Sequence, residues 1–172
     1  MSLDEVLSNG GHQNFAEPLG SIPNFGFTDA SYWFHVQLKA DPRLATRWLL
    51  EIGYPLLDQV DVHIIRNGVQ SESYHTGDLF PLAQRPIKHR LFLFPLTTQP
   101  AETIDLYIRV NTESAVQLPL QLWDPDTFYE QDEPRILAKA FVAGTLVIMF
   151  FYNLFLFFTI RDTNYLHYVG LV

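Results

Sequence analysis

The sequence predicts an all-β domain, two antiparallel sheets packed as a sandwich or jelly roll, followed by one apolar helix. Seven or eight short segments before residue 125 alternate or run apolar at strand length, with turn residues between them and no helical periodicity. Two sheets packed face to face are the natural architecture for such a pattern. Residues 140–160 then carry no charge, and as a helix they span roughly 30 Å, the thickness of a bilayer core.

The strands follow from the pattern in chain order. Tyr32 to Lys39 alternates strictly, and Asn67-Gly68 is a strong hairpin signal between two further strands. Phe25-Gly26-Phe27 is expected to be a turn. The expected strands are 32–39, 48–52, 60–65, 71–76, 91–96, 103–112 and 116–122. The apolar residues expected to face inward in the last two are Ile104, Leu106, Ile108, Val110, Val116, Leu118, Leu120 and Leu122.

Five parts are predicted along the 172 residues. Residues 1–20, rich in Gly, Asn and Ser, are expected to be a flexible lead-in to the β domain at 21–125. An acidic juncture at 126–139 precedes a transmembrane helix at 140–160, and 161–172 is a loop leading into a second, truncated apolar segment. The start lacks the basic and apolar regions of a signal peptide, so an exported domain is expected to begin after a removed signal. Because the second apolar segment is cut short, we interpret the chain as a fragment of a larger membrane protein.

Composition excludes several classes of function. The net charge is −8 and no Lys/Arg cluster is present, which argues against nucleic-acid binding. Cysteine is absent, so disulfides and thiolate metal sites are excluded. The six histidines lack zinc-site spacing, and no nucleophile elbow, P-loop or dinucleotide fingerprint occurs. The acidic cluster from Asp124 to Glu133 fails as an EF-hand because Tyr129 and Arg135 occupy its glycine and final glutamate positions.

The outward faces of two predicted strands form the most suggestive group. Aromatic rings beside amide and guanidinium donors suit sugar binding, because rings stack on the CH face and donors bind hydroxyls. Half-exposed strands also carry such residues merely because cross-strand pairs stabilise sheets. The group comprises Trp33, His35 and Gln37 on one strand and Tyr107, Arg109 and Asn111 on the other.

Three further residues are weaker candidates. Arg85 lies in a loop, where it either holds a polar ligand or bonds loop carbonyls. Asp58 and Asp61 lie three apart at a turn entering a strand. Such a pair could bind calcium or act as acid and base in glycoside hydrolysis, although an aspartate at a turn more often bonds the backbone.

The order of several motifs resembles the family 7TMR-DISMED2, the type 2 extracellular domain of bacterial seven-transmembrane receptors with diverse intracellular signalling modules. The resemblance covers roughly residues 20–172 and begins with Asn-Phe-Gly-Phe-Thr at 24–28 and Trp33 opening a strand. Further matching segments are 49–62, 77–78, Pro81, 85–86, 94–96, 106–110, 119–122, 152–158, 161–162 and 165–166.

The resemblance implies a jelly-roll sensor similar to carbohydrate-binding modules, with residues 1–139 in the periplasm and 140–160 in the bacterial inner membrane. It implies a carbohydrate-like small molecule or glycan as ligand, no resident cofactor, and a cytoplasmic output (kinase, diguanylate cyclase or phosphatase) not encoded in these residues. Some members sense calcium, which keeps a metal at Asp58 and Asp61 open. The family's tryptophan, aspartates and arginines map onto Trp33, Asp58, Asp61, Arg85 and Arg109.

Under the sensor interpretation the chain is not expected to be an enzyme. Two rival hypotheses remain open. The same aromatic face could pair with a second copy or a sister receptor as an interaction module. An enzymatic role would rest only on Asp58 and Asp61.

Overall fold

The computed structural model describes all residues except 1, 9–14, 17–21, 29, 44–45 and 161–172. The chain divides into two compact units, Met1–Pro125 and Asp126–Val172. The first unit contains the strands and the second consists, in its described part, of one helix. The loop and second apolar segment expected at 161–172 lie outside the described residues.

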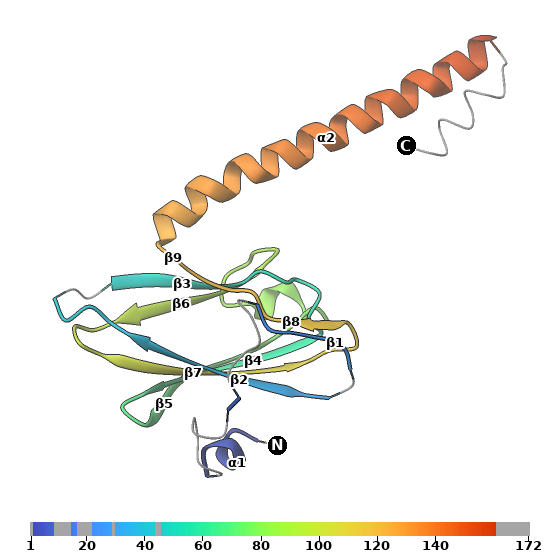
Figure 1. Ribbon diagram of the computed structural model, residues 1–172. Coiled ribbons are helices and arrows are strands. Elements are labelled where there is room, and N and C mark those ends of the chain that lie inside the picture. Colours follow the sequence, from blue (N-terminus) through green and yellow to red (C-terminus); the bar gives the residue numbers. More distant parts are fainter. Residues whose placement is uncertain (1, 9–14, 17–21, 29, 44–45, 161–172) are drawn as a thin grey trace. The chain divides into compact units, whose positions relative to one another are not determined.

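Among its described residues the first unit has two short helices and nine strands. Figure 1 shows how they are arranged. In chain order they are α1 (Leu3–Ser8), β1 (Asn24–Phe27), β2 (Tyr32–Lys39), β3 (Thr46–Ile52), β4 (Gln59–Arg66), β5 (Val69–Thr76), the 3₁₀ turn η2 (Leu82–Gln84), β6 (Phe92–Thr98), β7 (Thr103–Asn111), β8 (Ala115–Gln117) and β9 (Leu120–Trp123).

Two antiparallel sheets enclose one apolar core. The four-stranded sheet has the order β2-β7-β4-β5, the three-stranded sheet the order β6-β3-β9, and β1 pairs with β8 as a separate ribbon. Figure 1 shows the two larger sheets face to face. Their facing side chains form a single cluster that includes Ile52, Val62, Phe94 and Ile108, each 0% exposed. The predicted antiparallel all-β unit is therefore confirmed.

The alternation of the strands decides which residues enter this core. In β7, Ile104, Leu106, Ile108 and Val110 are all fully buried, as predicted. Successive side chains of a strand point to opposite faces, so the residues between them lie on the outer face of the four-stranded sheet. The hairpin at Asn67-Gly68 is also confirmed, because both residues have positive φ and lie between β4 and β5.

Two short elements near the N-terminus differ from the sequence expectations. Phe25-Gly26-Phe27, expected as a turn, belongs to strand β1, where Gly26 has a φ of 66° beside an irregularity in the pairing with β8. Residues 3–8 of the expected flexible lead-in form helix α1. Its start is a capping box: the backbone N–H of Glu5 donates to Ser2 Oγ at 3.3 Å, and that of Ser2 donates to Glu5 Oε2 at 2.7 Å.

The strand expected at 116–122 is split in two. β8 pairs with β1, whereas β9 pairs with β3 at the edge of the other sheet. Val116 and Leu118 are buried as predicted, while Leu122 on the edge strand β9 is 40% exposed. Trp123 ends β9, and its indole N–H donates to Glu51 Oε2 on β3 at 2.5 Å.

Helix α2 (Pro125–Ile160) includes both the acidic juncture and the expected membrane segment. Lys139–Ile160 is long and apolar enough to cross a membrane, with a mean hydropathy of 2.2, and its most apolar stretch is not buried within the protein. Its polar side chains bond inside the helix: Thr145, Asn153 and Thr159 each donate to the carbonyl four residues earlier. Such bonding leaves these groups satisfied without water, as a lipid environment requires.

A glycine fixes the loops at the end of the sheets where β4 begins. Gly77 has a φ of 155°, and a Cβ there would lie 1.9 Å from the carbonyl oxygen of Asp58. The neighbouring amide of Asp78 donates to the carbonyl of Leu57 at 2.8 Å. The loops before β4 and after β5 therefore approach so closely that only glycine fits.

We predict that Gly77→Ala lowers the free energy of unfolding by more than about 3 kcal/mol, because the backbone of one loop must move. The matched control is Gly68→Ala, where φ is 77° but nothing lies within 4 Å of the added carbon. There we expect only the backbone strain, about 1 kcal/mol. Urea unfolding of the full chain in detergent, followed by near-UV circular dichroism, measures both. Equal losses would contradict the close approach.

Candidate functional site

The strand register brings one polar or aromatic side chain from each of four neighbouring strands into a line. Trp33 on β2 lies opposite Arg109 on β7, Arg109 lies opposite Asp61 on β4, and Asp61 lies opposite His75 on β5. We call these four residues the outer row. The inward neighbours Val60, Val62, Ile108 and Val110 are fully buried, so the core holds the row on the outer face.

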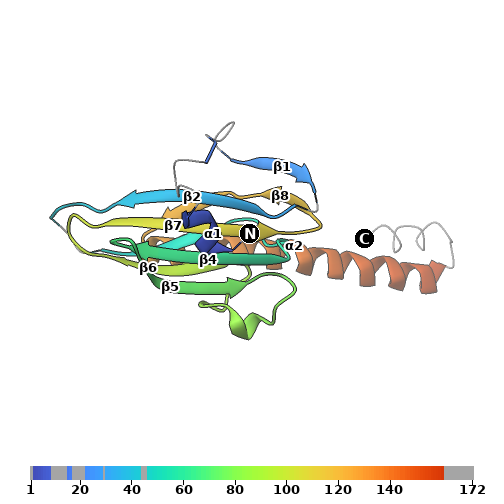
Figure 2. The same cartoon turned by 90° about the horizontal axis from the view of Figure 1, so that it is seen from below.

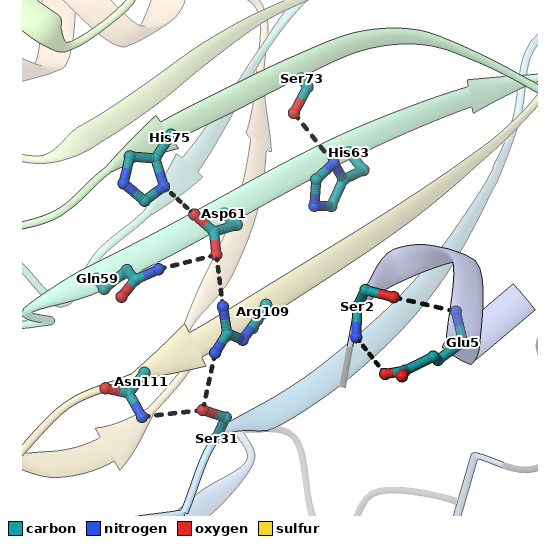
Figure 3. Close-up of polar contacts among 10 residues, drawn as sticks. All are labelled: Ser2, Glu5, Ser31, Gln59, Asp61, His63, Ser73, His75, Arg109 and Asn111. Atoms are coloured by element: carbon teal, nitrogen blue, oxygen red, sulfur yellow. Dashed lines mark hydrogen bonds and ion pairs between the residues drawn. The ribbon is translucent and has the colours of Figure 1, made fainter.

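Asp61 is the electrostatic centre of the outer row and is only 8% exposed. Its Oδ1 contacts His75 Nδ1, and its Oδ2 accepts from Gln59 Nε2 at 3.2 Å and from Arg109 Nη1 at 3.4 Å (Figure 3). A carboxylate removed from water needs such partners, because burying an unpaired charge is costly.

The Arg109 guanidinium makes two long hydrogen bonds and leaves one donor without an acceptor among the described residues. Besides the 3.4 Å bond to Asp61, its Nη2 donates to Ser31 Oγ at 3.3 Å. Charge-assisted bonds of this kind are ordinarily about 2.7–2.9 Å long. Its Nε is buried and has no acceptor among the described residues. Ser31 Oγ also accepts from Asn111 Nδ2 at 2.9 Å, so an amide of the predicted group joins the network.

A second row runs beside the first, from His35 on β2 through Tyr107 and His63 to Ser73 on β5. The His63 ring stacks against Trp33, with centroids 5.9 Å apart and planes 20° from parallel. Its Nδ1 bonds Ser73 Oγ at 3.0 Å. Burial lowers the pKa of His63 below its ordinary 6.5, and the nearby Asp61 charge opposes that shift.

The aromatic end of the second row is covered. Tyr107 is only 3% exposed, and burial raises its pKa, with the Asp105 charge adding to the shift. His35 lies against the Tyr107 ring at 4.7 Å and bonds Asp105 Oδ1 at 2.9 Å. Gln37 Nε2 donates to the same oxygen at 3.1 Å. Every member of the predicted outward group therefore lies on this face.

Asp58 and Arg85 are not part of this arrangement. Asp58 Oδ2 accepts from the backbone N–H of Glu113 at 2.7 Å and from Thr112 Oγ1 at 3.0 Å, so the carboxylate fastens the loop after β7. Arg85 Nη1 donates to the carbonyls of His89 and Arg90 at 2.7 and 3.0 Å, and the guanidinium lies 4.5 Å from the centre of the Phe92 ring. These contacts are the local ones expected of the structural alternative, although Arg85 Nε, like Arg109 Nε, is buried without an acceptor among the described residues.

Asp58 and Asp61, considered as a metal pair, serve different partners: the former holds a loop, the latter the outer row. Within the described part of the chain, no group of three or more His, Asp or Glu side chains is arranged to hold a metal ion.

Sequence reasoning missed the contribution of β4 and β5 to this face. The alternation of 60–65 already placed Asp61 and His63 on one side of their strand. Alternation does not give the strand order. In that order β7 lies between β2 and β4, so Asp61 and His63 on β4 are neighbours of Arg109 and Tyr107 on β7. The missed members of the face are Ser31, Gln59, His63, Ser73 and His75.

These features define an antiparallel two-sheet β domain joined in sequence to a helix long and apolar enough to cross a membrane. The family model of the 7TMR-DISM extracellular 2 domain matches residues 1–124, and the chain belongs to this family. The resemblance found from the sequence is thus confirmed, and the chain contains the extracellular sensor domain of a 7TMR-DISM receptor, a membrane protein with an extracellular part. No curated protein matches the chain.

We predict that His63 titrates below pH 6.5 in the folded protein and that Asp61→Asn lowers its pKa further, since that substitution removes the charge that favours the imidazolium. Because the folded pKa is depressed, the unfolded chain takes up the proton first as pH falls. His63 therefore contributes stability above pH 6.5 that is lost as pH drops through its folded pKa.

Histidine ring NMR of the full chain in micelles, assigned with His63→Gln, measures these shifts. Asp41→Asn, in an exposed loop, is the matched control and should leave the His63 titration unchanged. A His63 pKa at or above 6.5 would contradict the burial of this ring.

Proposed function

We propose that this jelly-roll domain is a periplasmic input domain that binds carbohydrate-like ligands on the outer face of its four-stranded sheet. In this proposal α2 lies in the bacterial inner membrane and passes occupancy to a cytoplasmic output module. The observation that carries the proposal is the outer row, in which a tryptophan, an arginine, an aspartate and a histidine from four strands lie side by side.

The chemistry of the row suits a sugar. Trp33 offers a ring for the CH face of a pyranose, and it is only partly buried. Arg109 and Asn111 carry donors for ligand hydroxyls, and the nearly buried Asp61 bonds Arg109 from the neighbouring strand. Binding sites for small molecules combine apolar surface with a few convergent polar groups in this way.

The incomplete bonding of Arg109 favours a ligand over a purely structural role. Its two bonds are long and its Nε has no acceptor in the described structure. A buried donor without an acceptor costs roughly 1–3 kcal/mol. A ligand oxygen that reaches this guanidinium would recover part of that cost, and the planar fork of arginine suits two oxygens at once.

A ligand changes the receptor only through its different affinities for two states of the domain. The chain passes from one sheet to the other between β2 and β3, β3 and β4, β5 and β6, and β6 and β7, and the two sheets share one core. The chain leaves this unit through β9, which is paired with β3. Signal transfer through β9 to α2 is accordingly part of the proposal.

We predict that Arg109→Lys weakens ligand binding about tenfold or more, because lysine keeps the charge beside Asp61 but loses the fork and its Nε donor. The control is Arg47→Lys on the exposed side of β3 in the other sheet. Calorimetry of the full chain in detergent, against cellotetraose, chitotetraose, tetragalacturonate, a muropeptide and calcium chloride, measures both. Saturable binding that Arg109→Lys leaves unchanged would place the site elsewhere.

A protein partner is the second candidate function, and the edge strand β5 favours it. This strand has eight residues and pairs only with β4 in the described structure. A free edge of that length can accept a strand from a second copy or a sister receptor. Silence across the whole titration panel, together with a dimer in analytical ultracentrifugation, would favour this function over ligand sensing.

A further inference from the structure

Helix α1 lies against the proposed binding face rather than away from the sheet. Figures 1 and 2 both show it on the outer side of β7 and β4. Val6 of α1 is 5% exposed and forms a small apolar cluster with Ile65 and Tyr107, which are 4% and 3% exposed. Leu3, Phe15 and Trp33 pack around this cluster. The close-up in Figure 3 shows α1, marked by Ser2 and Glu5, on the same face as Arg109.

This cluster occupies the aromatic surface that a ligand would use. The Phe15 ring lies 6.1 Å from the Tyr107 ring and 5.7 Å from the His35 ring. Trp33 packs against the cluster, and its indole Nε1 is buried without an acceptor among the described residues. A ring stacked over Tyr107 would therefore have to take the place of Val6 and Phe15.

The cover is of a kind that can be displaced. α1 has six residues, and helices this short are not stable alone in water. Its capping box is a local contact, since Ser2 before the helix and Glu5 in its first turn exchange hydrogen bonds. Within the cluster, α1 contacts the sheet through apolar side chains. These contacts provide no acceptor for Trp33 Nε1. A ligand with both a ring face and a hydrogen-bond acceptor can replace these contacts and add that bond.

We infer that the N-terminal segment, Ser2–Ser8 with Phe15, is a built-in competitor for the binding face, so that ligand binding and docking of α1 exclude one another. The inference rests on the proposed function and adds a regulatory element to it. While α1 is docked, the apparent affinity for ligand is lowered by the fraction of molecules whose face is free. Binding releases α1, which makes the N-terminal segment a reporter of occupancy.

The test compares Val6→Asp with Leu7→Asp in the full chain in detergent. Both variants place the same charge in the same helix, but Val6 is buried on the sheet whereas Leu7 is 38% exposed. The first readout is the ¹⁹F NMR line of 5-fluorotryptophan at Trp33, assigned with Trp33→Phe, and its broadening by the neutral nitroxide TEMPOL. The second is the affinity for the panel of four glycans given above.

We expect Val6→Asp to increase nitroxide broadening at Trp33 and to tighten glycan binding about fivefold, while Leu7→Asp behaves as wild type. An unchanged Trp33 line in Val6→Asp overturns the inference whatever the glycans do. Glycan binding that is unchanged or weaker in Val6→Asp also overturns it, because α1 would then be part of the site's wall while the proposed function stands. No glycan binding by any of the three proteins rejects the proposed function, and the competitor role with it.

Discussion

The alternation of β7 is the constraint on which the rest of the domain depends. This strand lies inside the four-stranded sheet, between β2 and β4, and its four apolar residues are fully buried. A slip of one residue would exchange the two faces, carrying Arg109 into the core and Ile108 to the outside. The free energy of the core therefore fixes the register, and the register in turn aligns Trp33, Arg109 and Asp61.

The outer row is not what stability alone would select. Asp61 is 8% exposed and needs His75, Gln59 and Arg109 around it, yet the bond to Arg109 is long. The Arg109 and Asp61 side chains are 31% and 11% exposed, and the cost of removing such charges from water offsets much of their attraction. Partly buried charges without an evident structural gain are characteristic of functional sites. By contrast Asp58 bonds the loop after β7, and two bonds from Arg85 Nη1 tie its loop to the carbonyls of His89 and Arg90, so both residues have local structural roles.

The sequence predicted the faces of the strands better than their neighbours. Alternation alone placed Trp33 and Arg109 outward, because a period of two leaves no other choice once the apolar set is buried. The partner of Asp61 was beyond such reasoning. Counting back from the pair Arg66–Val69 sets Asp61 opposite Tyr74, but a bulge between Ile64 and Ile65 shifts the pairing by one and sets it opposite His75.

The remaining errors have local causes. Segment 24–27 was predicted to be a turn because it contains Gly26, a common turn residue. A strand of only four residues with an irregular pairing has too little alternation to detect. Helix α1 was readable from Ser2 and Glu5, the two ends of its capping box, but the Gly-rich residues after it suggested a loose segment. What no pattern could show is that Val6 packs on the far side of the sheet from the main core.

The central claim is that the outer face around Arg109 binds a ligand, and amide chemical-shift mapping tests it most directly. Spectra of the ¹⁵N-labelled full chain in micelles would be recorded while cellotetraose, chitotetraose and tetragalacturonate are added in turn. We expect at least one of them to shift amides of β2, β7 and β4 around Trp33, Arg109 and Asp61, together with those of α1. Shifts confined to β3, β6 and β9, or no shifts with any of the three, would contradict the claim.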